Sequence, residues 1–186
     1  MTSRVHREGA AGFGSVTGIA RRSGSGGRMS ESISLLMFAV GPVRLGLALD
    51  AVDRVVLACE VTPLPGAPAP VLGAINLHGE IIPVLDVRLR LRLPSRAVLA
   101  DDQFLMVRAG GRRYALPVDE VDGVGEFAMD QVELSPEMLD GLSQLAGAVR
   151  LPDGLLIVEN PAQFLDTDSL RVLDHALQQR EASDVG

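Results

Sequence analysis

The chain has 186 residues and a mass of 19.7 kDa, enough for one ordinary domain or for two small barrels that share a core. Hydrophobic residues make up 47% and charged residues 22%, a composition that can bury a core and excludes a disordered polypeptide. With a net charge of -7 and only 3% aromatic residues, the chain lacks the basic field and stacking side chains of nucleic-acid-binding proteins.

Residues 1–30 are expected to form a disordered tail. Gly and Ser crowd residues 23–27, as in a flexible linker, and five arginines face a single acid in residues 1–28. The alternative is a basic arm that grips an acidic partner. The tail has no signal-peptide pattern, and the most apolar stretch, residues 35–49, is interrupted by Arg44 and too short to span a membrane. We therefore expect a cytoplasmic protein that does not insert into the membrane.

Short strand-like runs bounded by Gly and Pro dominate the sequence from Ser34 onward. Their close spacing favours antiparallel meanders, and Gly110-Gly111 marks a hairpin turn. Helical periodicity is confined to the C-terminus, where a helix is expected from Ser169 behind a capping Asp168, with residues 169–186 forming this helix and a tail. The expected strands are Leu35–Val40, Val43–Leu49, Ala74–Leu77, Ile81–Leu85, Phe104–Ala109, Arg112–Val118 and Leu155–Glu159.

An internal repeat relates two parts of the chain that lie 69 residues apart. Residues 36–55 align with residues 105–124 without a gap, with nine identities in twenty positions. Each copy reads as a strand, a tight turn, a strand and a short turn of helix, capped by Asp50 in the first copy and Asp119 in the second. Two copies of one unit imply an all-β fold of two pseudo-equivalent β-barrels that share a hydrophobic seam.

No catalytic, metal or phosphate-binding pattern is present. The pairs Asp50/Asp53 and Asp119/Asp122 lack the third nearby oxygen ligand that a hard cation needs, and are interpreted as structural. Cys59 follows an apolar strand-like run, so we expect a buried, inert thiol; as the single cysteine it excludes an intramolecular disulfide and fits a reducing compartment. His175 is expected to be an exposed or half-buried helix residue. We therefore expect neither an enzyme nor a cofactor or metal.

Residues 71–91 predict a β-hairpin. Two apolar strands, Gly73–Leu77 and Ile81–Leu85, flank a polar turn at residues 78–80. Pro83 cannot donate a ladder hydrogen bond, so its strand should be an edge strand or carry a bulge. Polar groups above two apolar strands form either a protruding rim that docks a partner helix or a solvated turn, and the residues alone do not decide between these.

This hairpin resembles the signature of the CheW-like domain, the coupling module of bacterial chemosensory arrays. The family pattern is Gly-x-Ile/Thr-Asn-Leu-Arg-Gly followed by Ile-x-Pro-x-x-Asp-Leu-Arg. The resemblance covers nearly all of residues 34–166, ending in GLLIVENPAQFL, and assigns residues 31–168 to one domain. The matching residues are Gly73, Asn76, Leu77, His78 and Gly79, then Ile82, Pro83, Asp86, Val87 and Arg88.

The resemblance implies both a fold and a role. The fold would be two five-stranded SH3-like β-barrels packed together, with short helices and a C-terminal helix. The role would be a non-catalytic adaptor that links the cytoplasmic tip of methyl-accepting chemoreceptors to the regulatory domain of a CheA-type histidine kinase, at membrane-associated receptor arrays. The implied receptor-facing rim consists of Asn76, Leu77, His78, Gly79, Glu80, Val52 and Arg54.

Two positions depart from the family pattern. His78 stands where the family usually has Arg, and Arg54 stands where an acid is common. Arginine is a permanent cation with a fork of donors, whereas histidine is shorter and mostly neutral near neutral pH. An alternative reading is therefore a diverged regulator of a pilus-motility or biofilm pathway that no longer assembles a standard array.

Overall fold

A computed structural model describes residues 32–133 and 145–183 of the chain. The predicted tail at residues 1–30 lies outside this range. Two helices, α1 (Val87–Arg90) and α2 (Thr167–Ser183), accompany the strands of the described part. The strands are β1 (Ser32–Val40), β2 (Val43–Ala48), β3 (Val52–Leu57), β4 (Val71–Leu77), β5 (Glu80–Leu85), β6 (Gln103–Ala109), β7 (Arg112–Val118), β8 (Glu120–Ala128), β9 (Val132–Glu133), β10 (Leu145–Leu151) and β11 (Gly154–Glu159).

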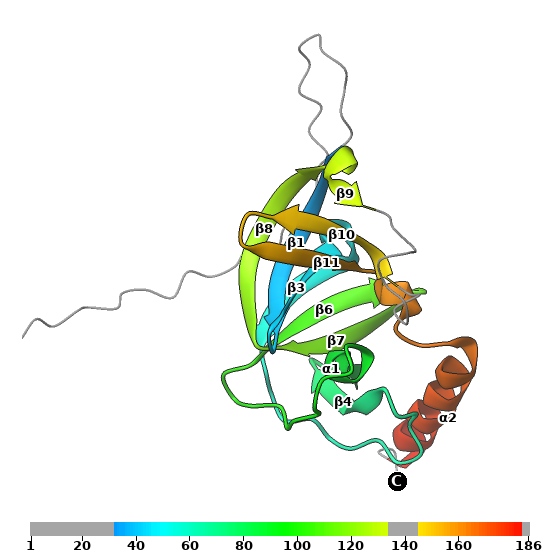
Figure 1. Cartoon of the computed structure of the whole chain (residues 1–186). Coiled ribbons are helices and arrows are strands. Elements are labelled where there is room, and N and C mark those ends of the chain that lie inside the picture. The colour runs from blue at the N-terminus through cyan, green and yellow to red at the C-terminus, as the bar shows by residue number, and fades with distance from the viewer. Residues whose placement is uncertain (1–31, 134–144, 184–186) are drawn as a thin grey trace, which may run out of the picture.

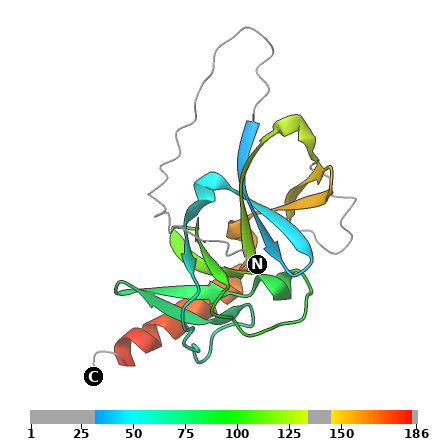
Figure 2. The ribbon, with the colours of Figure 1, turned by 90° about the vertical axis from the view of Figure 1, so that its left-hand side faces the viewer.

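The strands form two sheets, which lie one above the other in Figure 2. The first sheet has the order β8-β1-β2-β11-β10-β9, and the second has the order β3-β6-β7-β5-β4. Both sheets are mixed, because β2 pairs in parallel with β11 and β5 pairs in parallel with β7. The prediction of antiparallel meanders was therefore right for the hairpins and wrong for these two contacts.

Each sheet curls so that the two ends of its strand order are joined. In the first sheet, β8 continues through a 3-10 turn, Met129–Gln131, into β9, which pairs with β10. In the second, the chain after β3 reaches Thr62, which bridges to Ala74 in β4. Closure of this kind covers strand edges that would otherwise be open to pairing with other chains. The expected fold class, two small barrels with short helices and a C-terminal helix, is confirmed (Figure 1).

The two repeats exchange their third strands. β3 belongs to the first repeat in sequence but pairs with β6 of the second barrel, and β8 belongs to the second repeat but pairs with β1 of the first barrel. The registers are equivalent, since Leu36 faces Val124 and Leu105 faces Val55, each pair related to the other by the 69-residue offset. The repeat therefore builds two barrels that are interlocked through their strands.

The sequence predicts that Asp50 and Asp119 cap short turns of helix, but in the structure neither side chain does so. Asp50 lies within a 3-10 turn, Leu49–Ala51, that has no side-chain cap, and Asp119 joins two strands with no helix after it. Asp53 and Asp122 are the extra residues of two equivalent β-bulges, in β3 and β8. The segment after each hairpin is thus a strand, because the other repeat offers it an edge to pair with.

Three apolar clusters fill the molecule. The largest lies between the sheets and includes buried side chains from both, such as Phe38 and Leu105, together with Leu173 of helix α2. The second and third fill the individual barrels, around Phe104 and Leu156 respectively. The central residues of the hairpins β1–β2, β4–β5 and β6–β7 are therefore buried on both faces, which explains their nearly continuous apolar sequence.

Two local predictions are corrected. Helix α2 begins at Thr167. The side chain that caps it is that of Asp166 and not that of Asp168, because the Oδ1 atom of Asp166 accepts a hydrogen bond from the Ser169 amide at 2.7 Å. That bond lowers the pKa of Asp166.

Pro83 lies in β5, which is an inner strand of its sheet, with β4 at the edge. Its missing donor is tolerated because β5 pairs with β7 at the single pair Val84 and Ala115.

Candidate functional site

The predicted rim is centred on the two-residue turn between β4 and β5. His78 and Gly79 have φ angles of +56° and +89°, as a type I′ hairpin turn requires. Histidine is among the residues that adopt this left-handed conformation more readily than most. The Oδ1 atom of Asn76 accepts a hydrogen bond from the Gly79 amide at 2.8 Å. The turn is therefore fixed by its own residues, and Glu80 belongs to β5 and not to the turn.

The seven predicted rim residues differ in exposure. His78 and Glu80 are exposed, as are Asn76 and Gly79, while Leu77 is partly buried against the core of its barrel. On β3, Arg54 is exposed, and Val52 is partly buried against the core between the barrels. Val52 thus supports β3 from inside and offers little surface. The structure places both segments on one barrel, at strands that are not neighbours.

Four charged side chains connect those two segments. Arg113 on β7 binds Glu80 through Nη1 at 2.6 Å and Asp53 through Nε at 3.1 Å. Arg108 on β6 binds the other oxygen of Asp53 at 2.6 Å. We call these four residues the charge ladder, because they lie on successive strands of the order β3-β6-β7-β5. The ladder joins the start of β5 to the bulge between Val52 and Arg54.

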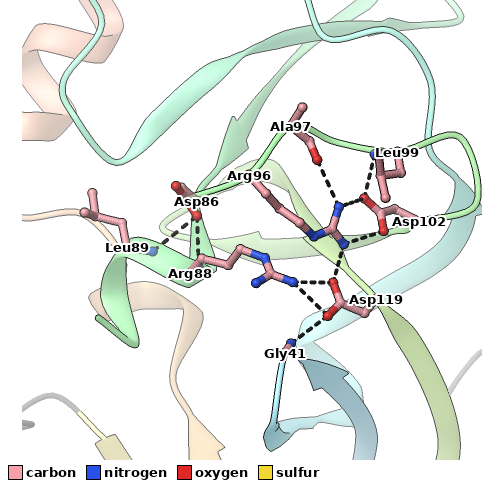
Figure 3. Close-up of polar contacts among 9 residues, drawn as sticks. All are labelled: Gly41, Asp86, Arg88, Leu89, Arg96, Ala97, Leu99, Asp102 and Asp119. Atoms are coloured by element: carbon pink, nitrogen blue, oxygen red, sulfur yellow. Dashed lines mark hydrogen bonds and ion pairs between the residues drawn. The ribbon is translucent and has the colours of Figure 1, made fainter. Parts of the chain in front are cut away.

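A second polar cluster holds the two barrels together. Asp119, where the chain crosses from β7 to β8, accepts from the amide of Gly41 at 2.6 Å and from Arg88 at 2.7 and 2.8 Å. Arg96 also binds Asp119 and forms two bonds of 2.6 and 2.7 Å with Asp102. Figure 3 shows both guanidinium groups converging on Asp119, with Gly41 of the β1–β2 turn on its other side. We call these five residues the inter-barrel clasp.

The clasp shifts the acidity of its carboxyl groups. The Arg96 hydrogen bond, opposed by burial, lowers the pKa of Asp102. Burial acts to raise the pKa of Asp119, but the bonds from Gly41, Arg88 and Arg96 outweigh it and lower that pKa. Arg96 itself has a raised pKa, chiefly through its bond to Asp102. Arg96, Asp102 and Asp119 are therefore charged near neutral pH, and the bonds among them are charge-assisted.

The residues that follow the hairpin in the family-like motif build this structure from within. Asp86 caps α1, accepting from the amides of Arg88 at 2.9 Å and Leu89 at 3.2 Å. Val87 is buried in the core between the barrels, and Arg88 reaches the clasp. These three residues therefore join the two barrels through a helix cap, a core contact and the clasp.

A second link between the barrels starts from the same helix. Arg90 on α1 binds the buried Glu159 at the end of β11 at 2.9 Å and lies over the Phe164 ring, 5.0 Å from its centroid. Burial raises the pKa of Glu159, although the Arg90 charge opposes this shift. Helix α1 is therefore anchored to both barrels although it has only four residues.

Among the described residues no group of His, Cys, Asp and Glu side chains could hold a metal ion. His175 is exposed on α2, as expected, and contacts Gln179. Cys59 is exposed, contrary to prediction, because β3 ends at Leu57 and the chain leaves the sheet before the thiol.

Comparison with known proteins identifies the family of this chain. The CheW-like domain model matches residues 34–170. The chain belongs to the CheW-like domain family. It is 26% identical over 149 residues to the chemotaxis protein CheW of Treponema pallidum, which covers 77% of this chain and 88% of that protein. The chemotaxis protein CheW of Rhizobium meliloti is 28% identical over 123 residues, 66% of this chain and 76% of the relative.

Solved structures agree on the fold. The scaffolding protein TtCheW from Thermoanaerobacter tengcongensis superposes with a TM-score of 0.68 at 24% identity, over 75% of this chain and 96% of that one. That structure shows the fold, and membership of the CheW-like domain family makes the chain a non-catalytic scaffold or adaptor of chemotaxis. In the described part of the chain, no helix is long and apolar enough to cross a membrane.

The charge ladder and the clasp were not found from the sequence. The clasp joins residues of two turns, one helix and one loop, for which no spacing rule exists. For the ladder a signal was present: Arg44 and Arg113 are identical between the repeats, and so are Asp53 and Asp122. In the structure Arg44 binds Asp122 at 3.6 Å and Arg113 binds Asp53 at 3.1 Å, so each repeat's arginine holds the other repeat's aspartate.

Proposed function

We propose that this CheW-like protein couples the cytoplasmic tip of methyl-accepting chemoreceptors to the regulatory domain of a CheA-type histidine kinase. The observation that supports it best is the rigid, exposed turn at His78 and Gly79, which carries the family motif at the end of one barrel. The receptor would contact Asn76, Leu77, His78, Gly79 and Glu80, with Arg54 of β3 beside them and Val52 supporting that strand. The kinase domain would pair with barrel ends.

The geometry suits recognition of a helical tip. A turn that is already fixed by the Asn76–Gly79 hydrogen bond loses little freedom on binding, which favours affinity. His78 has no hydrogen bond or ion pair to the described residues, so its ring is free to meet a partner. Arg54 is likewise exposed. The rim of this protein therefore presents one permanent cation, on β3, and an exposed imidazole ring at the turn.

Binding measurements test the proposal directly. A soluble cytoplasmic fragment of a methyl-accepting chemoreceptor and the regulatory domain of a CheA-type kinase, both from the same organism, are titrated separately into the purified protein. We expect both to bind, and the receptor fragment to bind more weakly to H78A. The control is H175A, an exposed histidine on helix α2 that is not among the proposed rim residues. Binding of neither partner by the folded protein would contradict the proposal and favour the diverged regulator.

The same titration tests the departure at position 78. H78R restores the family's usual cation, whose forked donors can hold a carboxylate in two bonds. We expect it to strengthen binding to a receptor fragment that has an acidic residue at the contact, by about threefold to tenfold, since one exposed charge pair contributes up to about 1 kcal/mol and a favourable one more. An unchanged dissociation constant would show that position 78 does not meet an acid.

A further inference from the structure

Arg113 is the only member of the charge ladder that touches both segments of the proposed rim. Its guanidinium holds Glu80, the first residue after the turn, at 2.6 Å and Asp53, which lies between Val52 and Arg54, at 3.1 Å. The side chain is 31% exposed, and Asp53 is 21% exposed. The contacts are therefore partly shielded from solvent, although they lie at the surface.

The surroundings of the ladder show that the arrangement is built in and does not result from a chance surface contact. Asp53 is the bulge residue of β3, so the bulge turns its carboxylate toward the neighbouring strands. Arg108 and Arg113 face each other across β6 and β7 and share that carboxylate, which offsets their mutual repulsion. Glu80, Arg108 and Arg113 line a groove whose opposite wall is helix α2, at Asp174 and Leu177.

The other barrel repeats this geometry away from the rim. Arg44, the equivalent of Arg113, holds the bulge residue Asp122 at 3.6 Å and Asp153 of the β10–β11 turn at 2.6 Å. Its side chain is 33% exposed, close to the value for Arg113. Each barrel thus has one arginine that ties its exchanged strand to the hairpin to which the arginine does not itself belong. The chain itself therefore supplies a matched control for any variant of Arg113.

We propose that Arg113 is a positioning residue for receptor recognition: it sets the separation between the β4–β5 turn and β3, so that both parts of the rim meet the receptor tip together. The inference rests on the proposed function. A guanidinium has donors in a fixed plane and can hold two carboxylates at once, which a lysine amine on a flexible stem does less well. Without Arg113 the strand pairing and the core of the barrel still hold β5 and β3, but no ion pair of the described residues joins Glu80 to Asp53, and the receptor would have to order these side chains.

The test compares three variants in titrations with the same soluble chemoreceptor fragment. R113M removes the charge, R113K keeps the charge but loses the fork, and R44M removes the equivalent contacts in the other barrel. We expect R113M and R113K to raise the dissociation constant about threefold to tenfold, because one or two segments would then have to be ordered on binding. We expect R44M to change the dissociation constant by less than about twofold. Binding of the kinase regulatory domain should be unchanged in R113M and R113K.

A second measurement separates positioning from general stability. Hydrogen exchange of the Gly79 amide, which is bonded to Asn76, should become faster in R113M and R113K and not in R44M, while all three variants melt within a few degrees of the wild type. If the wild type binds the receptor fragment and R113M binds it equally well, the inference is wrong and the proposed function stands. If R113K binds like the wild type, only the charge matters and positioning is also refuted. If the wild type does not bind, the proposed function fails, and this inference fails with it.

Discussion

The inter-barrel clasp can be tested by one isosteric substitution, D119N. The carboxylate of Asp119 accepts bonds from Gly41, Arg88 and Arg96, which lie on three different segments. An asparagine keeps one acceptor oxygen, so the Gly41 bond can persist, but the attraction of two guanidinium groups is lost. Hydrogen bonds to charged groups contribute about 1.5–3 kcal/mol each. Because the Asp119 side chain is 30% exposed, solvent screens part of this, and we expect a total loss of about 2 kcal/mol.

The loss should appear in both thermal and urea unfolding. In a chain of this size about 2 kcal/mol lowers the melting temperature by about 4–8 °C. The matched control is D50N, the equivalent position of the other repeat, where the exposed carboxylate has no cap bond. We expect that variant to change the free energy of unfolding by less than about 0.5 kcal/mol. Equal stability of the two variants would refute the view that Asp119 joins the barrels.

The clasp also predicts how the effect depends on pH. Asp102 and Asp119 have pKa values below the usual 3.8 in the folded protein, so the unfolded chain binds protons more readily. Their contribution to stability is therefore fully present above that value and is lost as the pH falls through the lowered pKa. The stability difference between wild type and D119N should stay constant from pH 7 to about 5 and shrink below about pH 4. An undiminished difference between the two proteins as the pH falls below about 4 would contradict this.

Three further variants or reagents test the packing. G73A should destabilise the protein by about 3 kcal/mol or more in urea unfolding, because an added Cβ would lie 2.3 Å from the Thr62 carbonyl oxygen that closes the second barrel; a fully stable variant would contradict that closure. L173A should lower the free energy of unfolding by about 2–5 kcal/mol, because Leu173 is fully buried. V172A should lower it by less than about 0.5 kcal/mol, because Val172 on the same helix is 44% exposed. Equal losses for the two variants would contradict the packing of α2 through Leu173. Cys59 should react with a thiol reagent in the native protein, and reaction only after denaturation would contradict its exposure.

The local elements of the fold were predictable because local chemistry determines them. The hairpins around Gly110-Gly111 and around His78-Gly79 were found from turn residues and flanking apolar runs, and both turns have the positive φ angles that these residues allow. β3 and β8 were missed because their partners come from the other repeat. Whether Val52–Leu57 continues as a helical turn or as a strand depends on the edge offered by β6, which no local pattern records.

The site was predictable to the same extent. The exposed turn is predicted by the dipeptide His78-Gly79, and the family motif that contains this dipeptide predicts its role in binding. The ladder was beyond reach of spacing rules, because Arg113 and Glu80 are 33 positions apart and meet only after the barrel closes. The spacing within the repeat predicts helix caps at both Asp50 and Asp119, and it does not reveal the role of Asp119, because its partners Arg88 and Arg96 lie in segments that the repeat does not contain.

Kinase control in a reconstituted system tests the central claim most directly. A CheA-type kinase and a methyl-accepting chemoreceptor from the same organism are combined in membrane vesicles, and kinase autophosphorylation is measured with and without this CheW-like protein. The account predicts that receptor-dependent control of the kinase requires the protein and is reduced by H78A and not by H175A. Full receptor control of the kinase in its absence, or no control in its presence although all components bind membranes and fold, would contradict the coupling role.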